Sequence, residues 1–167
     1  SFWHSNAFYP NDYTLAYLES MLGFQLIYGP LRLMGILPLP AIYMTLASIC
    51  IIGCALTDHA TKKIGRFNSW ERAFIVFGSH FCLPMVVFFN HYQLFGFQIA
   101  IPFFLYLYLF LRDWIFSRLI TATVLFCFAV CLSAYLAPML VSVSLFLAAY
   151  PLFMKAKKLK WRPRTPS

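Results

Sequence analysis

Two histidines are the residues of this chain best suited to binding a cofactor. His80 and His91 are eleven residues apart, close to three helical turns, so on one helix they would share a face about 16 Å apart. Imidazole is a usual axial ligand of haem, which makes both residues candidate cofactor ligands. The alternative is a hydrogen-bonded histidine facing the interior of a helical bundle or a partner helix, because ionisable groups within a membrane seldom face lipid. We therefore expect no cofactor, with haem as the alternative.

A second pair of ionisable residues, Glu19 and Arg32, interrupts an otherwise apolar stretch from Thr14 to Ile36. If this stretch is buried in a membrane, the two residues mark an interface or an ion path. They are thirteen residues apart, about 20 Å along a helix, so they cannot pair with each other there. If the stretch lies at the membrane surface, both side chains are solvated, and this is the interpretation we adopt.

A polybasic segment at the end of the chain is the third candidate site. Anionic lipids attract such segments, with about 1 kcal/mol for each cation near the surface. An acidic protein partner and a plain orientation signal are the alternatives. The six cations of this segment are Lys155, Lys157, Lys158, Lys160, Arg162 and Arg164.

Motifs for catalysis or metal binding are missing from the sequence. It contains none of the common nucleophile, metalloprotease or phosphate-loop patterns. Cys50/Cys54 and Cys127/Cys131 each have the i, i+4 spacing that shares a helix face. They lie in apolar runs without neighbouring charges that would favour thiolates, so we expect core packing and no metal site. The chain is not expected to be an enzyme.

The composition predicts where these residues are held. The 167 residues are 62% hydrophobic and 11% charged, with a mean hydropathy of +0.74, whereas soluble domains carry about 25% charged residues. From Leu119 to Met154 there is no Asp, Glu, Lys, Arg or His. Each helical crossing of a bilayer needs roughly 20 apolar residues, so this segment predicts an integral membrane protein.

The apolar runs predict an all-α fold, a polytopic membrane helix bundle of about five transmembrane helices, with four to six as the range. Residues 1–36 are expected to form an aromatic, interfacial or re-entrant segment, residues 37–154 the bundle, and residues 155–167 the polybasic tail. The polar stretch 57–72 is predicted to be a long loop, and Pro138 to break the last apolar segment. The expected spans are Leu37–Leu56, Ala73–Phe89, Leu94–Leu111, Leu119–Leu136 and Met139–Met154.

Charge placement supports five spans. With alternating sides, twelve of the thirteen Lys and Arg residues share one side, and Arg32 alone lies opposite. The positive-inside rule then predicts that the C-terminus is on the cytoplasmic side, or on the matrix side if the membrane is mitochondrial. A mitochondrial inner membrane and a bacterial cytoplasmic membrane both fit.

These features predict a non-catalytic, accessory or structural subunit of a larger membrane complex, of an energy-transducing or secretion-related kind. Few ionisable residues lie in the spans, and many apolar side chains are available for helix contacts. The expected partners are other membrane subunits and anionic lipids, and not nucleic acid. The alternatives are a small transporter or channel protomer, using Glu19, His80 and Arg32, and a haem- or quinone-associated anchor, using His80 or His91.

Overall fold

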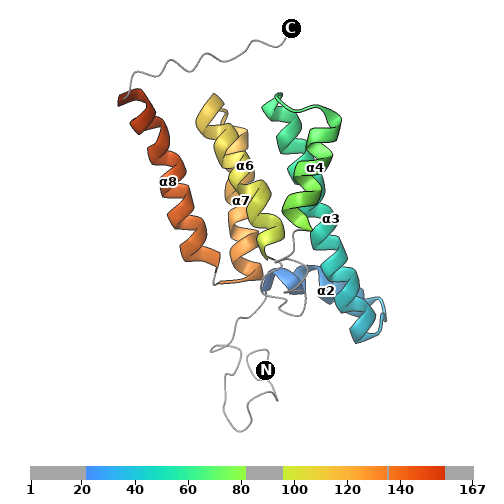
Figure 1. The fold of residues 1–167 in the computed structure, drawn as a ribbon. Coiled ribbons are helices and arrows are strands. Elements are labelled where there is room, and N and C mark those ends of the chain that lie inside the picture. Colours follow the sequence, from blue (N-terminus) through green and yellow to red (C-terminus); the bar gives the residue numbers. More distant parts are fainter. Residues whose placement is uncertain (1–21, 82–95, 135, 157–167) are drawn as a thin grey trace.

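The computed structural model describes residues 22–81, 96–134 and 136–156, and every regular element in these ranges is an α-helix. The all-α prediction is therefore confirmed for this part of the chain. The helices are α2 (Leu22–Leu33), α3 (Pro38–Ile64), α4 (Ser69–His80), α6 (Phe97–Asp113), α7 (Phe116–Leu132) and α8 (Leu136–Ala156) (Figure 1).

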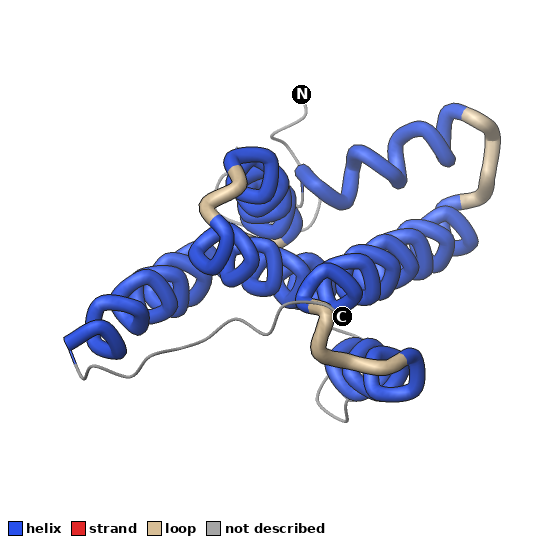
Figure 2. Tube along the Cα trace, turned by 90° about the horizontal axis from the view of Figure 1, so that it is seen from above, coloured by secondary structure: helices blue, strands red, loops and turns tan. Residues whose placement is uncertain are grey.

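The helices from α3 to α8 stand side by side and alternate in direction (Figure 1). Helix α6 is central, since it packs against α3, α7 and α8. Helix α2 lies across the end of the bundle and contacts α3 and α7. Seen from above, α8 lies at one edge, and the α2–α3 hairpin extends at the opposite one (Figure 2). Helices distant in sequence, such as α3 and α8, thus both pack onto α6.

Local sequence signals explain the limits of α3 and α4. Two prolines open α3, where the first N–H groups have no helical partner in any case. Gly65 ends it in the left-handed conformation, with φ 72°, which glycine adopts without steric cost. Asn68 then caps α4, since its side chain accepts from the Glu71 N–H at 2.9 Å while the Glu71 carboxylate accepts from the Asn68 N–H at 2.7 Å.

The predicted loop over residues 57–72 is wrong. Helix α3 continues eight residues beyond Leu56 to Ile64, so the connection to α4 is confined to residues 65–68. Thr57, Ala60 and Thr61 are buried, and the Thr61 hydroxyl donates to the Thr57 carbonyl at 2.9 Å. Packing of these small residues on the inner face therefore extends the helix through a segment whose polarity suggested a loop.

The other expected spans differ from the helices by a few residues at their ends. The break predicted near Pro138 occurs at Ser133–Ala134, because proline is accommodated in the first turn of α8. Trp114, with φ 56°, ends α6 and separates it from α7. The predicted span Ala73–Phe89 is described to Phe81 only, and its remainder lies outside the described residues, as does the segment before Leu22.

Among the described helices, α3 is long and apolar enough to cross a membrane by length and composition. It has 27 residues, and its most apolar window has a mean hydropathy of 2.0. Two further segments, Phe116–Leu132 and Leu136–Ala149, are apolar but shorter. This one helix indicates association with a membrane.

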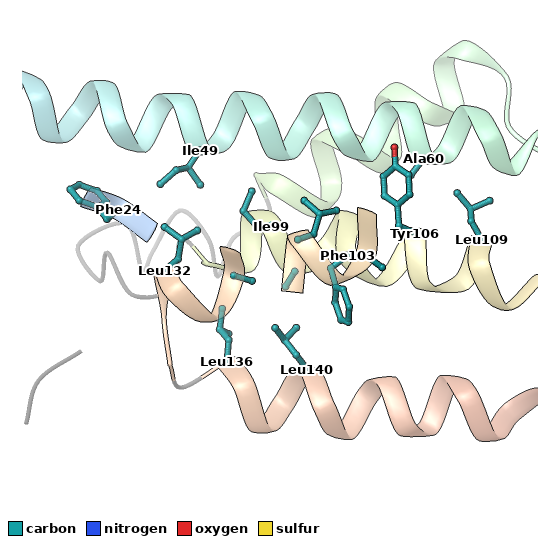
Figure 3. Close-up of a cluster of buried hydrophobic side chains, with 14 of the residues drawn as sticks. Phe24, Ile49, Ala60, Ile99, Phe103, Tyr106, Leu109, Leu132, Leu136 and Leu140 are labelled. Carbon is teal, nitrogen blue, oxygen red and sulfur yellow. The ribbon is translucent and has the colours of Figure 1, made fainter. Parts of the chain in front are cut away.

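The buried core is centred on α6, whose Ile99 and Phe103 face the other helices (Figure 3). Ile49 reaches it from α3, Leu132 from α7 and Leu140 from α8. These side chains are 5% exposed or less. The core is therefore a single apolar cluster that joins the helices on three sides of α6.

Helices α3 and α6 approach each other closely at Gly53. A Cβ atom placed there would lie 2.4 Å from the carbonyl oxygen of Gln98 and 3.0 Å from the His80 ring. No real Cβ tolerates such a contact with backbone, so the two helices meet at this distance only because residue 53 has no side chain.

We predict that Gly53→Ala destabilises the fold by about 1–3 kcal/mol, because the methyl group forces α6 away from α3. Gly78 is the matched control, since it is helical and a Cβ there meets nothing within 4 Å. Gly78→Ala should be neutral or stabilise by up to about 1 kcal/mol through helix propensity. Unfolding in mixed detergent micelles, followed by circular dichroism, measures both, and equal effects would contradict the close approach.

Candidate functional site

Three buried polar side chains meet where α3, α4 and α6 come together. Thr57, His80 and Gln98 are each no more than 4% exposed. The Thr57 hydroxyl lies 2.8 Å from Nε2 of His80, and Oε1 of Gln98 bonds to Nδ1 of the same ring. Nε2 of Gln98 donates to the His80 main-chain carbonyl at 3.1 Å. We refer to these three residues as the polar centre.

Hydrogen-bond roles define the state of the His80 ring. The His80 carbonyl can only accept, so the Gln98 amide nitrogen must face it and the Gln98 amide oxygen must face the ring. That oxygen also can only accept, so Nδ1 carries a hydrogen. In the neutral ring Nε2 is then an acceptor, and the Thr57 hydroxyl donates to it. Every polar atom of the imidazole has a partner.

Gln98 has a second role at the end of α4. His80 is the last residue of this helix, and the last carbonyls of a helix have no intrahelical donor. By donating to the His80 carbonyl, Gln98 satisfies one of them. The sequence suggested a hydrogen-bonded histidine that faces the interior, and the buried, hydrogen-bonded ring of His80 has this arrangement.

Iron ligation by His80 would require breaking one of these bonds. Both ring nitrogens are engaged, and a haem ligand must offer one of them. The other proposed ligand, His91, lies outside the described residues. Within the described ranges there is also no group of three His, Cys, Asp or Glu residues that would hold a metal ion. The chemistry of the polar centre is therefore that of a junction between three helices.

Charged residues form a second group, at the end of the bundle where α3 and α6 terminate. The Asp113 carboxylate accepts two hydrogen bonds from Arg112, one from Nε at 2.7 Å and one from Nη2 at 2.8 Å. It also pairs with Arg118. Asp58 of α3 pairs with Arg72 of α4 at 3.0 Å. These ion pairs connect neighbouring helix ends in the same region.

Two of these arginines also bind helix-terminal carbonyl groups. Arg112 of α6 donates to the Ile64 carbonyl at 3.1 Å and the Lys63 carbonyl at 3.2 Å, both in the last turn of α3. Arg118 of α7 donates to the Leu109 carbonyl in the last turns of α6 at 3.2 Å. A cation at a helix C-terminus also complements the helix dipole. The arginines therefore connect α3, α6 and α7 by charge and by hydrogen bonds.

The remaining predicted site residues are not brought together with His80. Arg32 is exposed on α2 and donates to the carbonyl of Ile36. His80, in contrast, meets α3 at Thr57, which is nineteen residues after the first residue of α3. This separation corresponds to about 28 Å along the axis of α3. Lys155 belongs to α8. Glu19 and the tail residues Lys157, Lys158, Lys160, Arg162 and Arg164 lie outside the described residues.

The sequence patterns did not predict Thr57 and Gln98 as partners of His80. Gln98 is the one amide in the apolar run Leu94–Leu111, and an isolated polar residue in such a run signals an interhelical hydrogen bond. Thr57 follows Gly53 by one helical turn, which is a signal for close helix approach. Thr57 was not considered because it was assigned to a loop.

Comparison with protein family models, with characterised proteins and with solved structures finds no match to this chain.

We predict that Thr57→Val destabilises the fold by about 1 kcal/mol, because Nε2 of His80 loses its donor. Thr45 is the matched control, since it is also fully buried on α3 but its hydroxyl donates only to the Ala41 carbonyl of its own helix. Thr45→Val should change stability little. Detergent unfolding monitored by circular dichroism compares the two, and an equal loss would mean that the bond to His80 contributes nothing of its own.

Proposed function

We propose that this chain is a non-catalytic, integral subunit of a larger membrane complex, folded as a polytopic bundle of about five transmembrane helices. The observation that carries the proposal is the distribution of side chains. Large apolar residues cover the outside of the bundle, buried Thr57, His80 and Gln98 bond to one another inside it, and most of the described charges gather at one end. A bilayer requires this distribution.

Helix α4 has the most pronounced apolar outer face. Trp70, Phe74, Phe77 and Phe81 follow one another at helical spacing and are 86, 84, 68 and 46% exposed. The rings of Phe77 and Phe81 stack on each other, with 5.4 Å between centroids. An aromatic face of this size is rare on a water-exposed monomer, and it suits contact with lipid chains or with a neighbouring helix.

The other helices expose apolar side chains as well. The exposed set includes Tyr43, Met44, Ile51 and Ile52 of α3, Phe116, Ile120 and Val124 of α7, and Val141, Leu145 and Phe146 of α8. In contrast, several polar side chains are buried, namely Thr45, Thr57, Thr61, His80, Gln98 and Ser133. Water disfavours the exposed apolar set, whereas Thr57, His80 and Gln98 are buried with their hydrogen bonds made.

Helix lengths and charges are consistent with a bilayer. Helix α3 is about 40 Å long and α8 about 31 Å, against a hydrocarbon core of about 30 Å. Among the described residues, every Lys and Arg except Arg32 lies at the end of the bundle where α3, α6 and α8 terminate. By the positive-inside rule this end faces the cytoplasm or the mitochondrial matrix, and the polybasic tail with it.

The polar centre favours a structural subunit over a transporter. A substrate or proton path needs polar groups that can exchange partners with water or cargo, whereas His80 is buried and saturated by Thr57 and Gln98. Arg32, the other described residue of the transport hypothesis, lies at a different level of the bundle. The outer apolar faces then serve contacts with neighbouring subunits and lipid.

Native gel electrophoresis tests this proposal. After gentle solubilisation of the native membrane, we expect the 19.3 kDa chain to migrate with a much larger assembly, whose other members mass spectrometry identifies. The band should lack haem absorbance attributable to this chain. After solubilisation in a harsh detergent the chain should migrate alone, as the control. Migration as a monomer or small homo-oligomer under gentle conditions would contradict the subunit role.

A further inference from the structure

The ends of α3, α6 and α7 carry more positive charge than their own carboxylates neutralise. Arg112 and Arg118 share one carboxylate, that of Asp113. Lys63 adjoins them, since its carbonyl accepts from Arg112 at 3.2 Å. These four residues, which we call the basic junction, have three cations and one anion, a formal charge of +2.

Nearby acids do not reduce this excess. Asp58 is paired with Arg72 at 3.0 Å. The Glu71 carboxylate accepts from the Asn68 N–H in the capping box of α4. Lys63 is exposed, and within the described ranges its one side-chain interaction is with the ring of Tyr106, whose centroid lies 5.8 Å from Nζ. Its ammonium group is therefore available to an anion from outside.

The charged groups of the basic junction are the ones that a phosphate can reach. Tyr106 beneath Lys63 is buried, and its hydroxyl lies 3.3 Å from Nδ1 of His59. Arg112 and Arg118 are 24% and 16% exposed at their side chains, so they are partly shielded from water while remaining reachable. Guanidinium groups form strong charge-assisted hydrogen bonds with phosphate, and a compact ammonium adds a point charge.

We propose that the basic junction binds the phosphate of an anionic lipid headgroup, held by Lys63 and by the partly exposed guanidinium groups of Arg112 and Arg118. The inference rests on the proposed membrane location and extends it, because the tail is the lipid site that the sequence suggests. Basic clusters between transmembrane helices on the cytoplasmic or matrix side bind anionic headgroups. The adjoining Trp114 and Phe116 are 75% and 69% exposed, and they offer apolar surface to the lipid chains.

Lipid titration of the full-length protein tests the proposal. The protein is purified in a zwitterionic detergent, phosphatidylglycerol is added, and native mass spectrometry measures the bound fraction, with phosphatidylcholine as the neutral reference. Lys63→Gln should weaken phosphatidylglycerol binding about fivefold, because it removes the cation that adjoins Arg112 and contacts the phosphate directly. Lys62→Gln is the matched control, because Lys62 is exposed in the same helical turn but has no described contact with α6. It should change binding less than twofold.

Further arms separate the alternatives. The polybasic tail is the same in every variant, so any phosphatidylglycerol binding by the tail cancels when the variants are compared. Lys63→Arg should retain binding. Equal losses for both glutamine variants, or unchanged binding in Lys63→Gln, would overturn the site. Binding of glycerol phosphate as tight as that of phosphatidylglycerol would overturn the lipid assignment. Alkaline carbonate extraction is run in parallel: release of the chain from membranes would overturn the proposed function, whereas its retention without a Lys63 effect overturns this inference alone.

Discussion

His80 joins three helices through the two nitrogens of one buried ring, and the position of α4 depends on it. Helix α4 packs against α3 and directs its aromatic face outward, so few apolar contacts hold its last turn on α6. Thr57 and Gln98 supply the missing attachment. A buried imidazole left without a partner would cost about 1–3 kcal/mol. If α4 shifted relative to α3 and α6, the His80 ring would lose these partners and incur this cost, so other positions of α4 are unfavourable.

The closeness of α3 and α6 is the condition for this contact. Gly53 lets the two helices approach, and Gln98 is on the segment of α6 that faces it. At the C-terminal ends of these helices, Arg112 of α6 binds the terminal carbonyls of α3. The α3–α6 pair is thus held at two levels, by a neutral polar contact within the bundle and by a charged one at its end. The neutral hydrogen bonds lie in the buried interior, whereas the ion pairs lie at the helix ends, where the arginine side chains are partly exposed.

Sequence patterns predicted the elements better than their contacts. The start of α3 at Pro38 and the break before α8 follow from prolines and apolar runs, which are local signals. The extension of α3 through Thr57 and Thr61 was not predicted, because burial of small polar residues depends on a facing helix. The partners of His80 are 18 and 23 residues away in sequence. An inward-facing histidine could be inferred, but choosing its partners requires the packing of α3, α4 and α6.

Accessibility of introduced cysteines tests the membrane arrangement most directly. In a chain whose five native cysteines are replaced by alanine, Met34→Cys, Phe67→Cys and Ile115→Cys each place one thiol in an exposed connection between helices. We expect a membrane-impermeant maleimide to label residues 67 and 115 from the cytoplasmic or matrix side and residue 34 only from the opposite side. Labelling of all three from one side would contradict it, because α3 would then not cross the membrane.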